Sequence, residues 1–451
     1  MKQVLWPASE LAALFDDPDF RADVTGVSID TRTLATGELF IALVDARDGH
    51  EFVPAAAAAG AAAAMVHHPV STDLPCLRVD DTFSGLQRLG QAARQRCDGR
   101  IVAITGSSGK TTLRHWTESI LRLLDQTHAS TGSLNNHWGV PLSLSRMPAD
   151  SRFGIFEIGT NSPGEIAPLS TLVAPHISVL LNVLPAHIGN FEGMAALQAE
   201  KLSIAAGLEP DGIFILPTAL AGASAHGRKL TFGFEPESDV CAVGLKEGIP
   251  SRLDVSMPDG RRYELMLPFA SRERMGTVLA LMAILYALDV DPSRVLEAFS
   301  TLSLPAGRGN AHQIGDIVVI DDSYNANPAS SKMAIQTLLG SQVSGRRIAL
   351  LGELLELGDL AASAHQEVIE AASGLDIIYT FGEGFEPLQD AATCFYPSVA
   401  DLDLDTFVNA LQPGDHVLVK GSNKVFWKHG FVDNLLKRIG ALRGHDQGAT
   451  H

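Results

Sequence analysis

Cysteine is scarce in this chain. The four that occur, Cys76, Cys97, Cys241 and Cys394, are far apart and show none of the close pairing that cysteine-based metal centres use. This excludes a metal centre of that kind, and the usage is typical of a protein that stays reduced inside the cell. We therefore expect a cytoplasmic protein.

Long apolar runs and an excess of positive charge are also missing. The longest strongly apolar stretch, 278–288, is too short to cross a bilayer and predicts a buried helix. The first residues, Met1 to Pro7, lack the apolar stretch of a signal peptide. With 34 Lys and Arg against 52 Asp and Glu, the formal net charge is −18. This charge argues against nucleic-acid binding and against an anionic membrane surface, although a locally positive loop could still bind a nucleotide.

What the chain does contain is enough apolar material for several cores. Its 451 residues, 46% of them hydrophobic, suggest about three domains. Short β-branched runs that end in glycine or polar loops alternate with helical periodicity, which predicts an α/β fold. We predict the domains 1–97, 98–308 and 309–451. The predicted strands are 37–43, 153–158, 177–183, 316–321, 347–351, 377–381 and 416–419, with a hairpin at 253–267. Helices are predicted at 55–64, interrupted at Gly60, and at 194–206 and 272–288.

The stretch 102–112, VAITGSSGKTT, is the centre of the functional argument. A β-branched run stops at Gly106 and helical periodicity follows the lysine, which predicts a strand, a tight loop and a helix. The N–H groups of the loop and the helix N-terminus would form a positive cradle for phosphate oxygens. Lys110 would reach the outer phosphates and the Thr111 hydroxyl would hold Mg²⁺. The pattern is the short form G-x-x-G-K-[ST], because Ile104 stands where the full pattern has its first glycine, and the alternative is an ordinary strand–helix turn.

Three further residues of the middle region suggest metal chemistry. Glu157 and His187 each follow a predicted strand, and Lys201 lies on a predicted helix. Because the ends of parallel strands converge, Glu157 and His187 could lie near Thr111 and complete a Mg²⁺ shell. The alternatives are a histidine satisfied by its own surroundings and an ordinary solvated lysine.

Polar clusters at both ends of the chain are candidates for ligand contacts. The segment Asp321 to Pro328, DDSYNANP, places two acids at a strand end before turn-favouring residues, which suits a ribose or phosphate contact. Its alternative role is a helix cap. Near the N-terminus, Asp30-Thr31-Arg32 could be a solvated turn, and Asp48 and His50 could be turn and cap residues.

Together these motifs resemble the Mur ligase family, in family order and through all three regions. The segment 322–327 resembles the members that add a dipeptide, and the Asp-Asn-Pro-Arg signature of the amino-acid-adding relatives is missing. The resemblance implies a small N-terminal α/β domain that binds the UDP-linked substrate, a central phosphate-loop ATPase domain and a Rossmann-like C-terminal domain.

The resemblance also implies a reaction. ATP, with Mg²⁺, would phosphorylate the terminal carboxylate of UDP-N-acetylmuramoyl-tripeptide, and the amine of D-alanyl-D-alanine would attack the acyl phosphate, as one step of peptidoglycan synthesis. We expect a monomer that neither binds nucleic acid nor inserts into a membrane. Two alternatives stay open. One is another ATP-dependent carboxylate–amine ligase of the superfamily, either amino-acid-adding or similar to folylpolyglutamate synthase. The other is a nucleotide-binding regulator without catalysis.

The resemblance assigns roles residue by residue. The implied catalytic residues are Lys110, His187, Lys201 and Arg308. One Mg²⁺ would be held by Thr111 and Glu157 and a second by His187 and a carbamylated Lys201. The implied nucleotide site comprises Thr105, Gly106, Ser107, Ser108, Gly109, Lys110, Thr111, Thr112, Arg308 at the γ-phosphate and Asp322 at the ribose. The implied substrate site comprises Ser28, Asp30, Thr31, Arg32, Asn135, Asn136, Asn325 and Asn327. The chain departs from the family near adenine, where Arg274 and Thr277 replace two asparagines.

Overall fold

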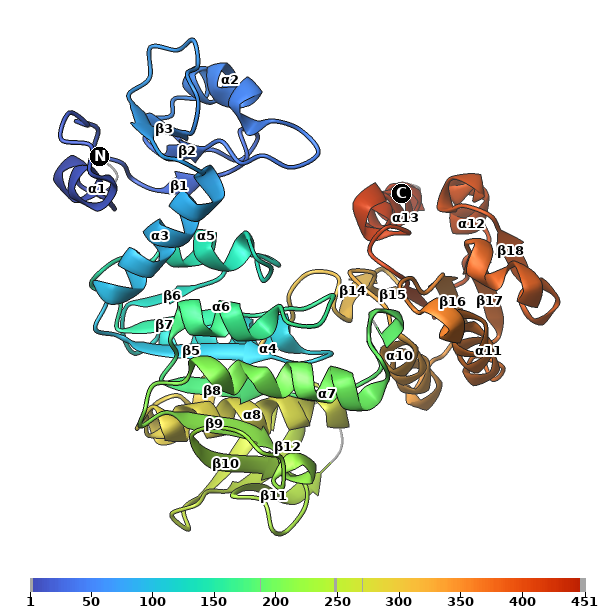
Figure 1. Ribbon diagram of the computed structural model, residues 1–451. Helices are drawn as coiled ribbons and strands as arrows, with labels where there is room; N and C mark the ends of the chain where they lie inside the picture. The colour runs from blue at the N-terminus through green and yellow to red at the C-terminus, as the bar shows by residue number, and fades with distance from the viewer. Residues whose placement is uncertain (1–2, 187, 247–249, 270, 447–451) are drawn as a thin grey trace.

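Three separate β-sheets organise the protein, and Figure 1 shows them as three lobes. The structure is a computed structural model that describes residues 3–186, 188–246, 250–269 and 271–446. The strand orders are β1-β2-β3-β4, then β13-β12-β11-β10-β9-β8-β5-β7-β6, and finally β14-β15-β19-β16-β17-β18. Each sheet lies within one of the three predicted regions, and the domain limits themselves stay a prediction. No described helix combines the length and the apolar character needed to span a membrane.

The first sheet is parallel throughout. Its elements are α1 (Ala8–Phe15), β1 (Val27–Ser28), β2 (Leu39–Ile41), α2 (Val53–Ala58), β3 (Ala63–Val66), β4 (Cys76–Arg78) and α3 (Thr82–Gln95). The predicted interruption of the helix 55–64 at Gly60 is confirmed, but the helix predicted beyond Gly60 is wrong, because Ala63 begins β3. All four residues of β3 are buried, and burial in a parallel sheet outweighs the helix propensity of alanine.

The second sheet carries the phosphate-loop segment at its centre. Its strands are β5 (Arg100–Thr105), β6 (Thr127–Ala129), β7 (Phe153–Glu157), β8 (Ile177–Leu180), β9 (Ile213–Pro217), β10 (Arg228–Gly233), β11 (Val240–Lys246), β12 (Ser251–Ser256) and β13 (Arg262–Leu267). The pairing is parallel from β6 to β11, and the predicted hairpin at 253–267 is confirmed as the antiparallel pair β12–β13.

Helices cover both faces of this sheet (Figure 1). Along β5, Val102 and Ile104 pack with α4 (Lys110–Leu121) and α8 (Arg272–Ala287), whereas Ile101 and Ala103 pack with α5 (Gly139–Ser145) and α6 (Ile166–Val173). Because both faces of β5 are covered by helices, its sequence is a continuous apolar run. The buried helix predicted from 278–288 is confirmed in α8. The remaining helices of this region are α7 (Met194–Leu202) and α9 (Leu296–Phe299).

The third sheet confirms the strands predicted after 309. Its strands are β14 (Asn310–Ile314), β15 (Ile317–Asp322), β16 (Arg347–Gly352), β17 (Ile377–Phe381), β18 (Cys394–Tyr396) and β19 (His416–Lys420). Only β14 runs antiparallel. One core contains α10 (Pro328–Gly340) and α11 (Ala361–Ala371), and the other contains α12 (Leu404–Asn409) and α13 (Phe431–Asp446).

Apolar packing joins the second and third lobes. Ile188 and Leu197 from the second lobe share a core cluster with Leu354 and Leu357 from the third. The loop after β5 in the second sheet and the loops after β15 and β19 in the third sheet line one cavity, so these strand ends meet between the two lobes. Ligands of open parallel sheets bind at this end of the strands.

Candidate active site

The predicted strand–loop–helix is confirmed, because β5 ends at Thr105 and α4 begins at Lys110. Gly109 has a φ of +78°, a conformation that favours glycine. A Cβ atom at Gly109 would lie 2.8 Å from the Leu181 side chain. The loop therefore depends on this glycine both for its backbone conformation and for its close packing on the segment that follows β8.

Asn182, which follows β8, holds the loop in place. Its Oδ1 accepts hydrogen bonds from the N–H groups of Ser107 and Ser108, each at 3.0 Å, and its Nδ2 donates to the Ser108 carbonyl at 3.1 Å. The N–H groups of Ser107 and Ser108, which the sequence predicts to bind phosphate, therefore donate to the Asn182 side chain instead. The N–H groups of the first turn of α4 have no acceptor within the helix and remain as donors for an anion.

Lys110 and Lys201 converge on one carbonyl oxygen. Their ammonium groups donate to the carbonyl of Gly106 at 2.8 and 3.3 Å. Burial lowers the pKa of Lys110. Burial, together with the charge of Lys110, lowers the pKa of Lys201 to about 7. Lys201 thus lies beside the phosphate loop with much of its amine uncharged near neutral pH.

A buried carboxylate lies next to Thr111. The Thr111 hydroxyl donates to Glu157 Oε2 at 2.8 Å, and the Asn135 amide donates to Oε1 at 2.7 Å. Glu157 is 2% exposed, and it lies close enough to Lys110 for its charge to act against burial and raise the pKa of that lysine. The Glu157 carboxylate and the Thr111 hydroxyl line the second cavity together, and oxygen ligands of this kind suit a bound divalent cation.

The third lobe contributes charged side chains from the opposite side. The Arg308 guanidinium lies over the Tyr324 ring, 4.2 Å from its centroid, and the Tyr324 hydroxyl contacts the hydroxyl of Ser133 in the second lobe. Lys420 pairs with Asp322 at 2.9 Å and donates to the Asn325 carbonyl at 2.7 Å. These contacts place Arg308 and Asp322 at the junction of the two lobes.

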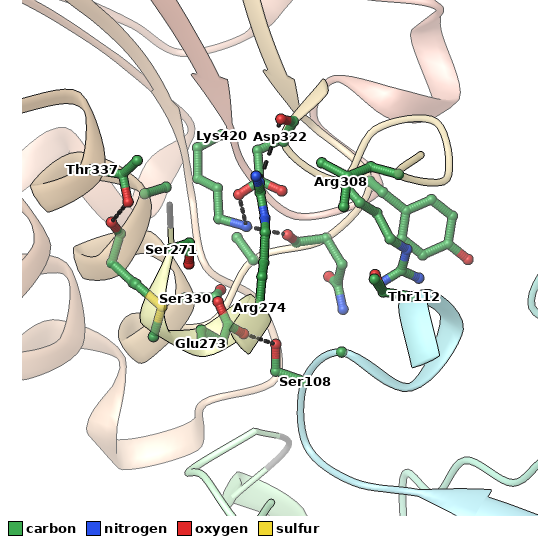
Figure 2. A pocket seen from close by; sticks show the side chains of 18 of the residues that line it. Ser108, Thr112, Ser271, Glu273, Arg274, Arg308, Asp322, Ser330, Thr337 and Lys420 are labelled. Carbon is green, nitrogen blue, oxygen red and sulfur yellow. Dashed lines mark hydrogen bonds and ion pairs between the residues drawn. The ribbon is translucent and has the colours of Figure 1, made fainter. Parts of the chain in front are cut away.

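Two neighbouring cavities collect most of the predicted residues. Figure 2 shows the first, where Ser108 and Thr112 of the second lobe face Arg308 and Asp322 of the third. The second cavity is lined by Lys110, Thr111, Asn135, Glu157, Arg308, Asn325 and Asn327, among others. Ser107, Ser108 and Gly109 line both. The structure therefore brings the phosphate loop, the carboxylate and the residues of the third lobe together.

Other predicted residues have different surroundings. Among the described residues, Ser28, Asp30, Thr31 and Arg32 line neither cavity. Ser28 ends β1, and the other three lie in the turn that follows, in which Asp30 and Arg32 pair at 2.6 Å. The lining of the two cavities also leaves out Thr105, Gly106 and Lys201, although Lys201 contacts Gly106 directly. His187 lies outside the described residues.

Two predicted asparagines act as helix caps. Asn136 Oδ1 accepts from the N–H of Gly139 at the start of α5, at 2.9 Å. Asn327 forms a capping box with Ser330 at the start of α10, although it also lines both cavities. For the segment 321–328, the helix-cap alternative is therefore confirmed at Asn327.

Several residues of the site have no clear signal in the sequence. Glu273 accepts a hydrogen bond from the Ser108 hydroxyl at 3.1 Å, and the neighbouring Arg274 enters the same cavity (Figure 2). The pairing of Lys420 with Asp322 joins strand ends that are distant in the sequence. Tyr324 lies within the marked segment DDSYNANP, and Arg274 lies in the stretch where the chain departs from the family.

Comparisons with known proteins point to one family along most of the chain. The family model described as Mur ligase middle domain matches residues 104–284, and the model described as Mur ligase, glutamate ligase domain matches 307–423. The UDP-N-acetylmuramoyl-tripeptide–D-alanyl-D-alanine ligase of Escherichia coli is 32% identical over 89% of this chain and 92% of its own length. The Synechocystis ligase of the same name is 32% identical over 89% and 90%.

A solved structure agrees with these relatives. The crystal structure of MurF from Acinetobacter baumannii is similar with a TM-score of 0.85 at 28% identity, over 97% of this chain and all of the other. The predicted three-domain α/β architecture is thus confirmed, and the chain belongs to the Mur ligase family.

Proposed function

We propose that this protein joins D-alanyl-D-alanine to UDP-N-acetylmuramoyl-tripeptide at the expense of ATP, forming a peptide bond for peptidoglycan synthesis. The similar ligases of Escherichia coli and Synechocystis carry the name of this reaction and extend over nearly the whole chain. The observation that carries the proposal is the cavity where Lys110 and Thr111 face Arg308. We further propose that the protein is a cytoplasmic monomer, in keeping with its four free cysteines.

Within this proposal, cationic side chains handle the phosphoryl group. A carboxylate is a poor electrophile, and phosphorylation gives it a leaving group that the amine of the dipeptide can displace. The transferring phosphoryl group carries negative charge that must be neutralised. Lys110 does so from the loop of the second lobe and Arg308 from the third lobe, while Asp322 accepts hydrogen bonds from the ribose.

The chemistry of the donor set fits Mg²⁺. This ion prefers oxygen ligands, and the Thr111 hydroxyl and the Glu157 carboxylate, 2.8 Å apart, supply them where both residues line the second cavity. When bound, the ion would neutralise phosphate charge. Asn135 holds the second carboxylate oxygen and so fixes the direction of the first. We keep His187 and Lys201 as proposed ligands of a second ion.

At the other end of the substrate, we propose that Ser28, Asp30, Thr31 and Arg32 contact the uridine diphosphate. The exposed guanidinium of Arg32 is oriented by Asp30 through hydrogen bonds at 2.9 and 2.6 Å, so one positive group is fixed at the end of β1. Asn325, which lines the second cavity, is proposed for the peptide end together with Asn135 and Asn327. Asn136 is proposed only as support, because its side chain caps α5.

Release of phosphate is the direct test of this function. With ATP and Mg²⁺ present, phosphate should accumulate only when both UDP-N-acetylmuramoyl-tripeptide and D-alanyl-D-alanine are added. Replacing the dipeptide by a single amino acid, or the UDP-tripeptide by a folate, tests the related ligases. Equal phosphate release in the presence and absence of the dipeptide would contradict the proposal, and a pure regulator would release none in any mixture.

The lowered pKa of Lys201 predicts a pH dependence of carbamylation. Carbon dioxide reacts with the neutral amine, and a pKa of about 7 leaves most of the amine neutral above pH 7 and protonates it below. We expect native mass spectrometry in bicarbonate to detect a carboxylate adduct on the protein at pH 8 and much less at pH 6. The adduct should be missing in Lys201→Arg and present in Lys332→Arg, whose lysine lies on the surface of α10. An adduct that survives in Lys201→Arg would disprove the assignment.

A further inference from the structure

Three histidines and an aspartate gather in the first lobe, away from the proposed ligase chemistry. Asp48 and His50 follow β2, and His67 and His68 follow β3 directly. Because β2 and β3 are parallel neighbours, their carboxyl ends meet at one edge of the sheet. This is the edge of an open parallel sheet at which ligands bind. Of the residues that the structure describes, only His50, His67 and His68 bring three possible metal ligands within 4.8 Å of one another.

The carboxylate of Asp48 connects this group. Its Oδ1 accepts from His50 Nδ1 at 2.6 Å and its Oδ2 lies 3.2 Å from His68 Nε2. His50 is buried, and its Nε2 accepts the backbone N–H of His67 at 3.0 Å. Both nitrogens of His50 thus have partners that fix the ring, and the ring in turn fixes Asp48. His68 stacks on His50 with centroids 3.8 Å apart, yet 44% of its side chain is exposed.

We propose that Asp48, His67 and His68 bind a divalent transition-metal ion of the Zn²⁺ type, with His50 as the residue that orients Asp48. Imidazole nitrogen and carboxylate oxygen are the ligands that zinc takes in proteins, at about 2.0–2.2 Å. His68 Nε2 lies 3.2 Å from Asp48 Oδ2, a separation that two ligands of one tetrahedral ion can have. The hydrogen bond from the buried imidazole of His50 would hold the Asp48 carboxylate in a fixed direction, as the outer hydrogen-bond partners of metal ligands do.

The packing itself favours an ion. Three imidazole rings lie with centroids 3.8–5.1 Å apart, so protonation of more than one would create repulsion at short range. A metal ion uses the neutral rings and also balances the carboxylate of Asp48. None of these residues belongs to the cavities beside the phosphate loop, but the site shares its sheet edge with the proposed uridine diphosphate contacts, because Ser28 ends β1 beside β2.

Equilibrium dialysis of the full-length protein, prepared without a histidine tag and stripped with a chelator, tests the proposal. We expect the wild type to retain one Zn²⁺ and to melt at a higher temperature with zinc, because binding stabilises the folded state. His67→Gln and His68→Gln should each weaken zinc binding at least about 10-fold. The melting temperature of His68→Gln without zinc should stay near that of the wild type, since the ring of His68 is exposed.

Two control variants separate this site from others. His226→Gln removes an exposed histidine elsewhere, and Glu157→Gln removes the proposed Mg²⁺ ligand, so both should bind zinc as the wild type does. Zinc binding that is unchanged in His67→Gln and His68→Gln, or missing in the wild type, would overturn the proposal. The zinc assay contains no ATP or UDP-substrate, so a failure of the proposed ligase function would leave its result unaffected. A failure to bind zinc would likewise leave the phosphate-release test unaffected.

Discussion

Replacing Lys110 with alanine should lower the rate of phosphate release at saturating substrates by about 10³-fold. Lys110 is half-buried at the start of α4, where it lines the second cavity and its ammonium group donates to the Gly106 carbonyl. Charge stabilisation in such a site is worth far more than in water, and it is needed most in the transition state. The loss should therefore appear mainly in kcat rather than in KM.

The control for this variant is Lys332→Ala, which removes a lysine that pairs with Glu367 on the surface of the third lobe. It should keep nearly the full rate. Thermal unfolding should show that Lys110→Ala is folded, because removing a half-buried cation relieves a desolvation cost. A Lys110→Ala variant that is folded and retains a near-normal rate would remove the phosphate loop from the mechanism.

Glu157→Gln should lower kcat by about 10²-fold and raise the Mg²⁺ concentration needed for half of the maximal rate. The amide keeps the size of the side chain but removes the negative charge from a position that is 2% exposed. It also turns one of the two oxygens that contact Thr111 and Asn135 into a nitrogen. Rates measured across a Mg²⁺ titration give both effects.

The matched control is Glu264→Gln, on the exposed edge strand β13 at the far side of the same sheet. Its Mg²⁺ dependence should match that of the wild type. If Glu157→Gln shows the same half-maximal Mg²⁺ concentration as this control, Glu157 is not a metal ligand and the buried carboxylate needs another explanation.

The sequence predicts the core of the site because local rules determine it. A β-branched run, two glycines and a lysine before helical periodicity determine a strand, a loop and a helix within a dozen residues. The C-terminal strands were predictable for the same reason, since each is a short apolar run ended by a glycine or polar loop. That Glu157 lies beside Thr111 follows from the convergence of parallel strands, which a sequence pattern can indicate.

The remaining features depend on contacts between distant segments. The bond from Asn182 to the phosphate loop and the pairing of Lys420 with Asp322 each join two strand ends that no local pattern connects. Helix caps were hard to distinguish from ligand contacts, as Asn136 shows, because an asparagine serves both roles equally well. The alanine stretch 55–64 was misassigned in part because burial in the sheet, which the sequence does not reveal, outweighs helix propensity.

A crystal structure with a non-hydrolysable ATP analogue would show whether the phosphate loop holds the nucleotide. The phosphates of the analogue should lie against the loop 106–109 and the first turn of α4, with Lys110 and Arg308 on the terminal phosphate and the ribose next to Asp322. An analogue bound elsewhere in the protein, with the loop unoccupied, would contradict this prediction.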